Sequence, residues 1–187
     1  MKSLNIYVNE GLADWGEDDT FNKKISKQTS KSAIQQEIIE WVAKNTKERI
    51  YKNKFKFDFS TSPITVNYNG NIRYTTTITS LTSDIFQWGE VGGNFECSFC
   101  GLLESLEGAP EKVKDVFSCS HCQSLKSLKG APKEVEDFYC NNCKSLKSLK
   151  GAPEIVRGFF DCCYCGTKFT ENDVKKVSNV KGDILII

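Results

Sequence analysis

Phe-Glu-Cys-Ser-Phe-Cys at 95–100 begins the pattern that decides how this 187-residue chain folds. The pattern returns as Phe-Ser-Cys-Ser-His-Cys (117–122), Phe-Tyr-Cys-Asn-Asn-Cys (138–143) and Phe-Asp-Cys-Cys-Tyr-Cys (160–165). Its first cysteines stand at 97, 119, 140 and 162, so the steps are 22, 21 and 22 residues. A period this short and regular is typical of a solenoid, in which each repeat makes one coil and stacks on the next.

The segments between the copies are also repeated. Leu-Lys-Ser-Leu-Lys-Gly-Ala-Pro occupies 125–132 and 146–153, and Leu-Glu-Ser-Leu-Glu-Gly-Ala-Pro occupies 103–110. Phe-x-Cys places both side chains on one face of a short strand, and Gly-Ala-Pro turns the chain back. Stacked coils should therefore align three columns of apolar side chains. These are Phe95, Phe117, Phe138 and Phe160; Leu106, Leu128 and Leu149; and Val113, Val135 and Val156.

On these residues the chain resembles the leucine-rich repeat family, in its short, cysteine-containing bacterial and phage-like form. Phe-x-Cys-x-x-Cys-x-x-Leu stands where that family has Leu-x-Leu-x-x-Asn/Cys-x-Leu, with one extra residue before the Leu. The resemblance covers roughly the C-terminal half of the chain. It implies a solenoid over 93–187 whose variable strand residues form a concave surface.

The cysteines allow more than one interpretation. Buried reduced thiols are favoured, because every coil carries the same two cysteines and cysteine is among the most buried residue types. Structural zinc is the alternative, because paired Cys-x-x-Cys motifs fit four-thiolate sites. Disulfides come third. The zinc hypothesis uses Cys97, Cys100, Cys119 and Cys122 for one ion and Cys140, Cys143, Cys162 and Cys165 for a second. Cys163 follows an inward cysteine on a strand, so we expect it to point outward as an exposed thiol.

The charge totals and the first residues of the chain indicate which partners and which cellular location to expect. The 25 basic and 24 acidic residues leave a net charge of +1, which disfavours a protein that coats nucleic acid. The start lacks the apolar core of a signal peptide, and no stretch is long enough to span a membrane, so an intracellular protein with reduced thiols is expected. Residues 1–28 are expected to form a polar arm. Within it, Ile6-Tyr7-Val8-Asn9-Glu10-Gly11-Leu12 resembles the leaders of large-bacteriophage proteins, which implies the host cytoplasm or the virion.

An α+β head is predicted over 29–92. A helix over 29–46 follows from apolar residues at helical spacing, with Ser32 and Gln35 as a capping box. Alternating residues predict strands at about 54–59, 64–68 and 72–79. We expect a three-residue loop, Asn69 to Asn71, to join the last two as a hairpin, because it keeps both apolar faces together. The head should cover the open edge of the first coil.

A C-terminal cap is predicted over 167–187. Thr170 should begin a short helix up to Val177, with Glu171 and Asp173 in its first turn. Ile184 and Ile186 should continue the Phe and Cys columns without cysteine. The fold class is therefore α+β: a helix and β-meander head, a short solenoid and a capping repeat.

For function, the sequence favours a non-enzymatic protein-binding module, and the resemblance of the leader and the repeats implies a phage protein that acts on a host factor or in the virion. The chain has no phosphate loop, nucleophile elbow or zinc-protease motif, and the single His121 occupies a variable repeat position. Variable outward positions on the strands are the expected contact residues: Glu96, Ser118, His121, Tyr139, Asn141, Asp161 and Tyr164. The alternative is a zinc-stabilised nucleic-acid binder that uses a lysine ladder, with Lys126, Lys129, Lys147 and Lys150. Apart from zinc, no cofactor is expected.

Overall fold

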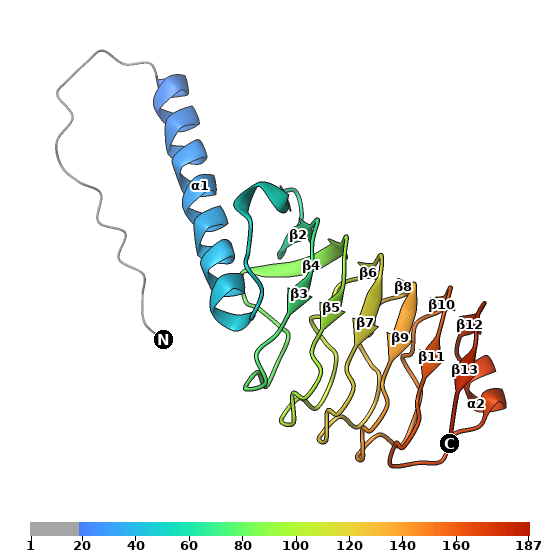
Figure 1. The fold of residues 1–187 in the computed structure, drawn as a ribbon. Coiled ribbons are helices and arrows are strands. Elements are labelled where there is room, and N and C mark those ends of the chain that lie inside the picture. Colours follow the sequence, from blue (N-terminus) through green and yellow to red (C-terminus); the bar gives the residue numbers. More distant parts are fainter. Residues whose placement is uncertain (1–18) are drawn as a thin grey trace. The chain divides into compact units, whose positions relative to one another are not determined.

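The computed structural model describes residues 19–187, with side chains from Ser30 onward. Its elements are a helix α1 (Asp19–Asn45), a β-hairpin, and a parallel β-solenoid of about six turns (Figure 1). Helix residues up to Ile34 belong to one compact unit, and Gln35–Ile187 form the second. The predicted fold class is confirmed. None of the helices in residues 19–187 has the length and apolar character that a membrane crossing requires.

Two sheets run the length of the solenoid. The seven-stranded sheet contains, in spatial order, β1 (Phe55–Asp58), β2 (Ile64–Tyr68), β4 (Phe86–Val91), β6 (Lys112–Val113), β8 (Glu134–Val135), β10 (Ile155–Val156) and β12 (Asn179–Val180). The six-stranded sheet contains β13 (Ile184–Leu185), β11 (Phe160–Asp161), β9 (Asp137–Tyr139), β7 (Val116–Ser118), β5 (Phe95–Glu96) and β3 (Ile72–Arg73). Each coil therefore gives one short strand to each sheet. The sequence analysis predicted the strand at Phe-x-Cys and missed the second strand, which carries the Val column.

The predicted apolar columns are confirmed. Phe95, Phe117 and Phe138 lie in register on adjacent strands and are fully buried. Their rings stack with centroids 5.5 and 5.6 Å apart and planes within 8° of parallel. Phe160 continues the column at 5.2 Å with a tilt of 46°, and Ile184 pairs with it in the last coil. Because each ring contacts equivalent rings above and below, the coils bury a continuous core that no single coil could form.

Glycine makes the Gly-Ala-Pro corner possible. Gly108, Gly130 and Gly151 have φ values of +90°, +91° and +88°, which side chains rarely tolerate. A Cβ on Gly130 would lie 2.5 Å from the backbone of Leu106 and Glu107 in the preceding coil. The corner therefore needs glycine both for its conformation and for the close approach of two coils.

Two predictions about the head are wrong. Helix α1 begins at Asp19, ten residues before the predicted start, so Ser32 and Gln35 lie inside the helix and do not form its capping box. The residues from Asp19 to Thr29 contain neither Gly nor Pro, so nothing in them ends a helix. Residues 19–28 are thus helical, and the rest of the predicted arm, including the leader-like 6–12, lies outside the described residues.

The hairpin predicted at Asn69 to Asn71 is also absent. Strand β2 pairs antiparallel with β1 and parallel with β4, whereas β3 belongs to the other sheet and pairs with β5. The regular strand β3 covers only Ile72–Arg73 of the predicted 72–79. Asn69 to Asn71 therefore forms a corner of the first coil. The alternation of apolar and polar residues could not distinguish a hairpin from a coil corner, because inward and outward residues also alternate in a solenoid strand.

The edge of the first coil is covered as predicted. From Gln35 onward, α1 buries Ile38 and Val42 completely, and Trp41 packs edge-on against Tyr74 and Phe86. The backbone N–H of Lys47 donates to Arg73 O at 2.7 Å, and the N–H of Thr75 donates to Asn45 O at 3.0 Å. The chain after α1 thus pairs with the exposed edge of the six-stranded sheet.

The C-terminal cap contains the predicted short helix, α2 (Glu171–Lys175). Thr170 is its N-cap and forms a reciprocal capping box with Asp173. Val174 is fully buried, so α2 contributes an apolar side chain to the core of the C-terminal cap.

Candidate functional site

The outward face of the six-stranded sheet gathers the residues that the sequence predicts as partner contacts. Glu96, Ser118, Tyr139 and Asp161 lie side by side on four consecutive coils, because their strands pair in that register. Asn141 belongs to the next row along the coils, and His121 and Tyr164 lie at the corner beyond it. The structure thus brings all seven residues to one face and its adjoining corner. Their contact role stays a prediction.

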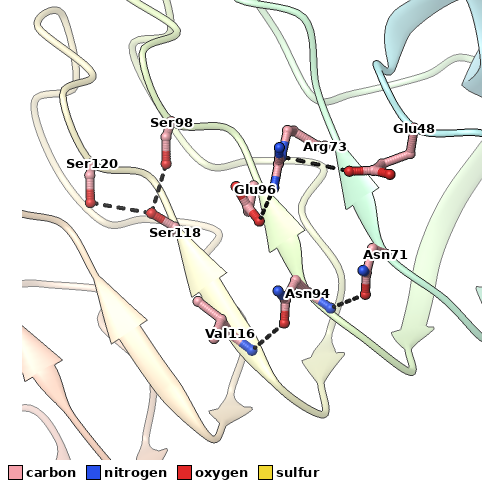
Figure 2. Close-up of polar contacts among 9 residues, drawn as sticks. All are labelled: Glu48, Asn71, Arg73, Asn94, Glu96, Ser98, Val116, Ser118 and Ser120. Atoms are coloured by element: carbon pink, nitrogen blue, oxygen red, sulfur yellow. Dashed lines mark hydrogen bonds and ion pairs between the residues drawn. The ribbon is translucent and has the colours of Figure 1, made fainter.

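In the first coils, the side chains of this face bond mainly to one another (Figure 2). Arg73 lies between Glu96, at 3.0 Å from Nη2 to Oε1, and Glu48, at 3.7 Å from Nε to Oε1. The hydrogen bond and charge of Glu96 raise the pKa of Arg73. Glu96, a predicted contact residue, therefore already has a partner within the chain.

Polar ladders continue across the same coils. Asn71 Oδ1 accepts from the backbone N–H of Asn94 at 3.0 Å, and Asn94 Oδ1 accepts from that of Val116 at 3.3 Å (Figure 2). The hydroxyls of Ser98 and Ser118 share a hydrogen bond of 2.7 Å, and those of Ser118 and Ser120 share one of 3.2 Å. Ser120 donates onward to Asn141 Oδ1. The side chains of Ser118 and Asn141 thus join neighbouring coils, which leaves them fewer hydrogen-bonding groups for a partner.

The later coils present a different surface. Tyr139 is half-buried, and its pKa is raised by burial and then by the charges of Asp137 and Asp161. Asp161 Oδ1 accepts from the backbone N–H of Cys163 at 2.9 Å, and Asp137 Oδ1 accepts from that of Phe159 at 2.7 Å. The ring of Phe159 is 42% exposed. Aromatic rings and carboxylates thus replace the hydroxyl and amide ladders of the first coils.

The corner of each Cys-x-x-Cys motif has an unusual backbone. Phe99, His121, Asn142 and Tyr164 have φ values of +62°, +60°, +58° and +55°. Among side chains other than glycine, asparagine tolerates this left-handed region best, whereas bulky residues there are uncommon. Yet Phe99 is 61% exposed and Tyr164 is 52% exposed, so burial does not repay the strain. We call these four residues the corner row.

Four exposed apolar residues on or beside this face are absent from the predicted contact set. They are Phe99 and Phe159, described above, Leu102, which is 63% exposed, and Leu185, which is 42% exposed and lies beside Asp161 in the last coil. The sequence carried a signal for two of them. Phe159 precedes the inward Phe160, so it must point outward, and Leu102 occupies a position where the later repeats have Ser124 and Ser145.

The prediction for Cys163 is wrong. Its side chain is only 9% exposed, and burial raises the pKa of its thiol to about 11. The equivalent Ser120 is 8% exposed, so neighbouring coils cover this row even though it points away from the Phe column. Cys163 is therefore a protonated, sheltered thiol and not an exposed reactive one.

All eight cysteines of the Cys-x-x-Cys motifs are reduced, and seven of them are buried. The second cysteine of a coil donates to the backbone carbonyl of the first cysteine in the preceding coil: Cys122 to Cys97 O, Cys143 to Cys119 O and Cys165 to Cys140 O, each at 3.1 Å. Within residues 30–187 no three or more His, Cys, Asp or Glu side chains are grouped to hold a metal ion. The sulfurs predicted as two four-thiolate zinc sites are thus arranged as a file along the coils.

The lysine ladder is on the segment after the strand, as expected. Lys126 pairs with Glu104 at 2.8 Å and Lys129 pairs with Glu107 at 2.6 Å, and all four side chains are exposed. These glutamates neutralise the first half of the ladder, which weakens its attraction for a polyanion. Nucleic-acid binding stays an untested prediction. No family model matches the chain, and comparisons with curated proteins and with solved structures found no match either.

Proposed function

We propose that the protein is a non-enzymatic binding module that holds a protein partner on the outward face of the six-stranded sheet and on the corner row. The observation that carries this proposal is the corner row itself. Phe99 and Tyr164 adopt a left-handed backbone while more than half of each side chain is exposed. Strained non-glycine residues cluster where function requires them, and exposed aromatic side chains are favoured at protein interfaces.

The later coils are the preferred centre of this surface. Their side chains combine two tyrosines, an exposed phenylalanine and carboxylates, whereas the polar groups of the first coils are engaged with one another. Tyrosine supplies contact area at low entropic cost and dominates the energetics of many interfaces. The resemblance to leucine-rich repeats agrees with this use of a strand face, although fold alone does not dictate function.

The proposal is tested by capturing partners from extracts of the producing cells with purified variants. The test variant combines Tyr139→Ala, Asp161→Ala and Tyr164→Ala. The control variant combines Lys126→Ala, Lys129→Ala and Lys147→Ala on the exposed ladder. We expect the test variant to lose a partner that the wild type and the control both retain, with melting temperatures close to that of the wild type.

Two results would overturn the proposal. If the test variant captures the same proteins as the wild type, the surface is misplaced. If the ladder variant alone loses capture, and the lost component is nucleic acid, the nucleic-acid alternative takes its place.

A further inference from the structure

Strand β1 lies at the end of the seven-stranded sheet, and its outer edge pairs with no other strand among the residues that the structure describes. Its one neighbour is β2, to which it pairs antiparallel. The corresponding edge of the six-stranded sheet is closed within the chain, because the segment after α1 bonds to the backbone of Arg73 and Thr75. An open strand edge is where a further strand can add to a sheet.

The backbone of Phe57 carries free hydrogen-bonding groups on this edge. The N–H of Asn69 donates to Lys54 O at 2.9 Å, so these two residues form a hydrogen-bonded pair of the β1–β2 ladder. Because such pairs alternate along an antiparallel ladder, the backbone groups of Lys56 and Asp58 point toward β2 and those of Phe57 point away from it. In the described part of the chain, the N–H and C=O of Phe57 meet no hydrogen-bond partner.

The side chains of β1 alternate between an apolar face and a charged face. The rings of Phe55 and Phe57 stack with centroids 5.7 Å apart, and Phe57 is only half-buried. Lys56 and Asp58 lie on the other face and are exposed, and neither forms an ion pair within the described residues. Asp58 Oδ1 accepts from the N–H and the hydroxyl of Ser60, which leaves Oδ2 for a cation.

These features are complementary to a second copy of the same strand. Two antiparallel β1 strands related by a twofold axis at Phe57 exchange two hydrogen bonds between their Phe57 backbones. This register also places Lys56 of each copy opposite Asp58 of the other copy, so two opposite-charge pairs form. An axis at Lys56 would oppose two lysines, and an axis at Asp58 would oppose two aspartates, which is unfavourable. Charge complementarity therefore selects the register centred on Phe57.

We propose that β1 is the contact strand of a symmetric dimer of this chain, in which two seven-stranded sheets join antiparallel at their β1 edges. The half-buried Phe57 ring then meets its equivalent beside the twofold axis, and aromatic cross-strand pairs stabilise a sheet. The two Lys56–Asp58 pairs fix the register on the charged face. The contact belongs to a different sheet from the surface proposed for partner binding, so the two proposals stand independently.

Sedimentation equilibrium of the purified chain over a range of concentrations tests the proposal. The contact is one short strand per copy, so we expect a reversible equilibrium between monomer and dimer. Lys56→Asp and Asp58→Lys should each weaken the dimer at least about tenfold, because each substitution twice places like charges opposite one another. The matched control, Lys147→Asp, makes the same charge change on the exposed lysine ladder and should dimerise as the wild type does.

Mixing the two charge variants tests the register itself. In a heterodimer of Lys56→Asp with Asp58→Lys, both cross-strand pairs again join opposite charges, so an equimolar mixture should dimerise although each variant alone does not. A wild-type chain that stays monomeric, charge variants that dimerise as the wild type does, or a mixture that fails to associate would each overturn the proposal. Circular dichroism shows whether each variant folds, and Lys56→Glu and Asp58→Arg replace any variant that does not.

Discussion

The rings of Phe99 and His121 lie parallel, 4.4 Å apart between centroids and 8° apart in plane, although both residues have a left-handed backbone. Each belongs to a different coil at the same corner, so the stack extends the regularity of the core to an exposed edge. The strain of the two backbones is only partly repaid by the stack, which is worth about 0.5–1.5 kcal/mol for an aromatic pair. The regular stacking of the coils therefore extends to the corner row, which belongs to the proposed binding surface.

Replacing Tyr164 by asparagine should uncouple stability from binding. Tyr164 has φ +55° and a side chain 52% exposed, and Asn142 already occupies the equivalent position of another coil. We expect Tyr164→Asn to keep or raise the free energy of unfolding, by up to about 1 kcal/mol, because asparagine tolerates this backbone better. Partner capture should weaken. Urea unfolding measures the first effect, and a loss of more than about 1 kcal/mol would contradict the strain argument.

Gly130 and Gly101 should respond very differently to the same substitution. Gly130→Ala forces a side chain into a φ of +91° and against the backbone of Leu106 and Glu107, so we expect a loss of more than about 2 kcal/mol. A Cβ on Gly101 meets nothing within 4 Å, so Gly101→Ala should change stability by less than about 0.5 kcal/mol. Equal losses in the two variants would show that the corners do not approach as described.

Phe117 and Phe159 provide a matched pair for the core column. Phe117 is fully buried between two stacked rings, so Phe117→Ala should cost about 3–5 kcal/mol. Phe159 is 42% exposed, and Phe159→Ala should cost much less. Denaturant unfolding measures the loss of unfolding free energy in both variants. A larger loss for Phe159→Ala than for Phe117→Ala would contradict the burial of Phe117 in the core column.

Alkaline pH should destabilise the protein through its buried thiols. Burial raises the pKa of Cys100 to about 12, whereas a free thiol has a pKa of about 8.5. Between these values the folded state holds more protons than the unfolded state, so stability is intact below about pH 8 and falls as the pH rises toward 12. Unfolding at several pH values should show this fall, and Cys100→Ala should make it shallower. A free energy of unfolding that rises above about pH 9 would contradict the burial of the thiols.

The repeat made most of the solenoid predictable. Identical residues at a fixed period demand equivalent environments, so the stacking of Phe95, Phe117 and Phe138 followed directly from the sequence. The head was harder, because Ile64 to Ile72 alternates as either a hairpin or a coil corner, and only the long-range pairing of β2 with β4 separates them. The left-handed backbone of the corner row was hidden for a related reason. Phe99 and Tyr164 are residue types that ordinarily avoid this conformation, so composition pointed away from it.

The candidate face was predictable in outline and not in detail. Variable residues beside fixed ones identified Glu96, Tyr139 and Asp161 as outward. Whether such a residue is free depends on its neighbours in adjacent coils, and Arg73 engages Glu96 from outside the repeat. The period of the repeat shows which residues point outward. It does not give the distances between side chains of neighbouring coils, which decide whether those side chains pair.

Site-specific photo-crosslinking tests the central claim most directly. A photoreactive phenylalanine analogue placed at Tyr164 lies on the corner row, and the same analogue placed at Lys112 lies on the opposite, seven-stranded sheet. Irradiation in extracts of the producing cells should join Tyr164-labelled protein to a protein partner and leave Lys112-labelled protein uncrosslinked. Crosslinking from Lys112 with none from Tyr164 would contradict the account, because it would place the partner on the other sheet.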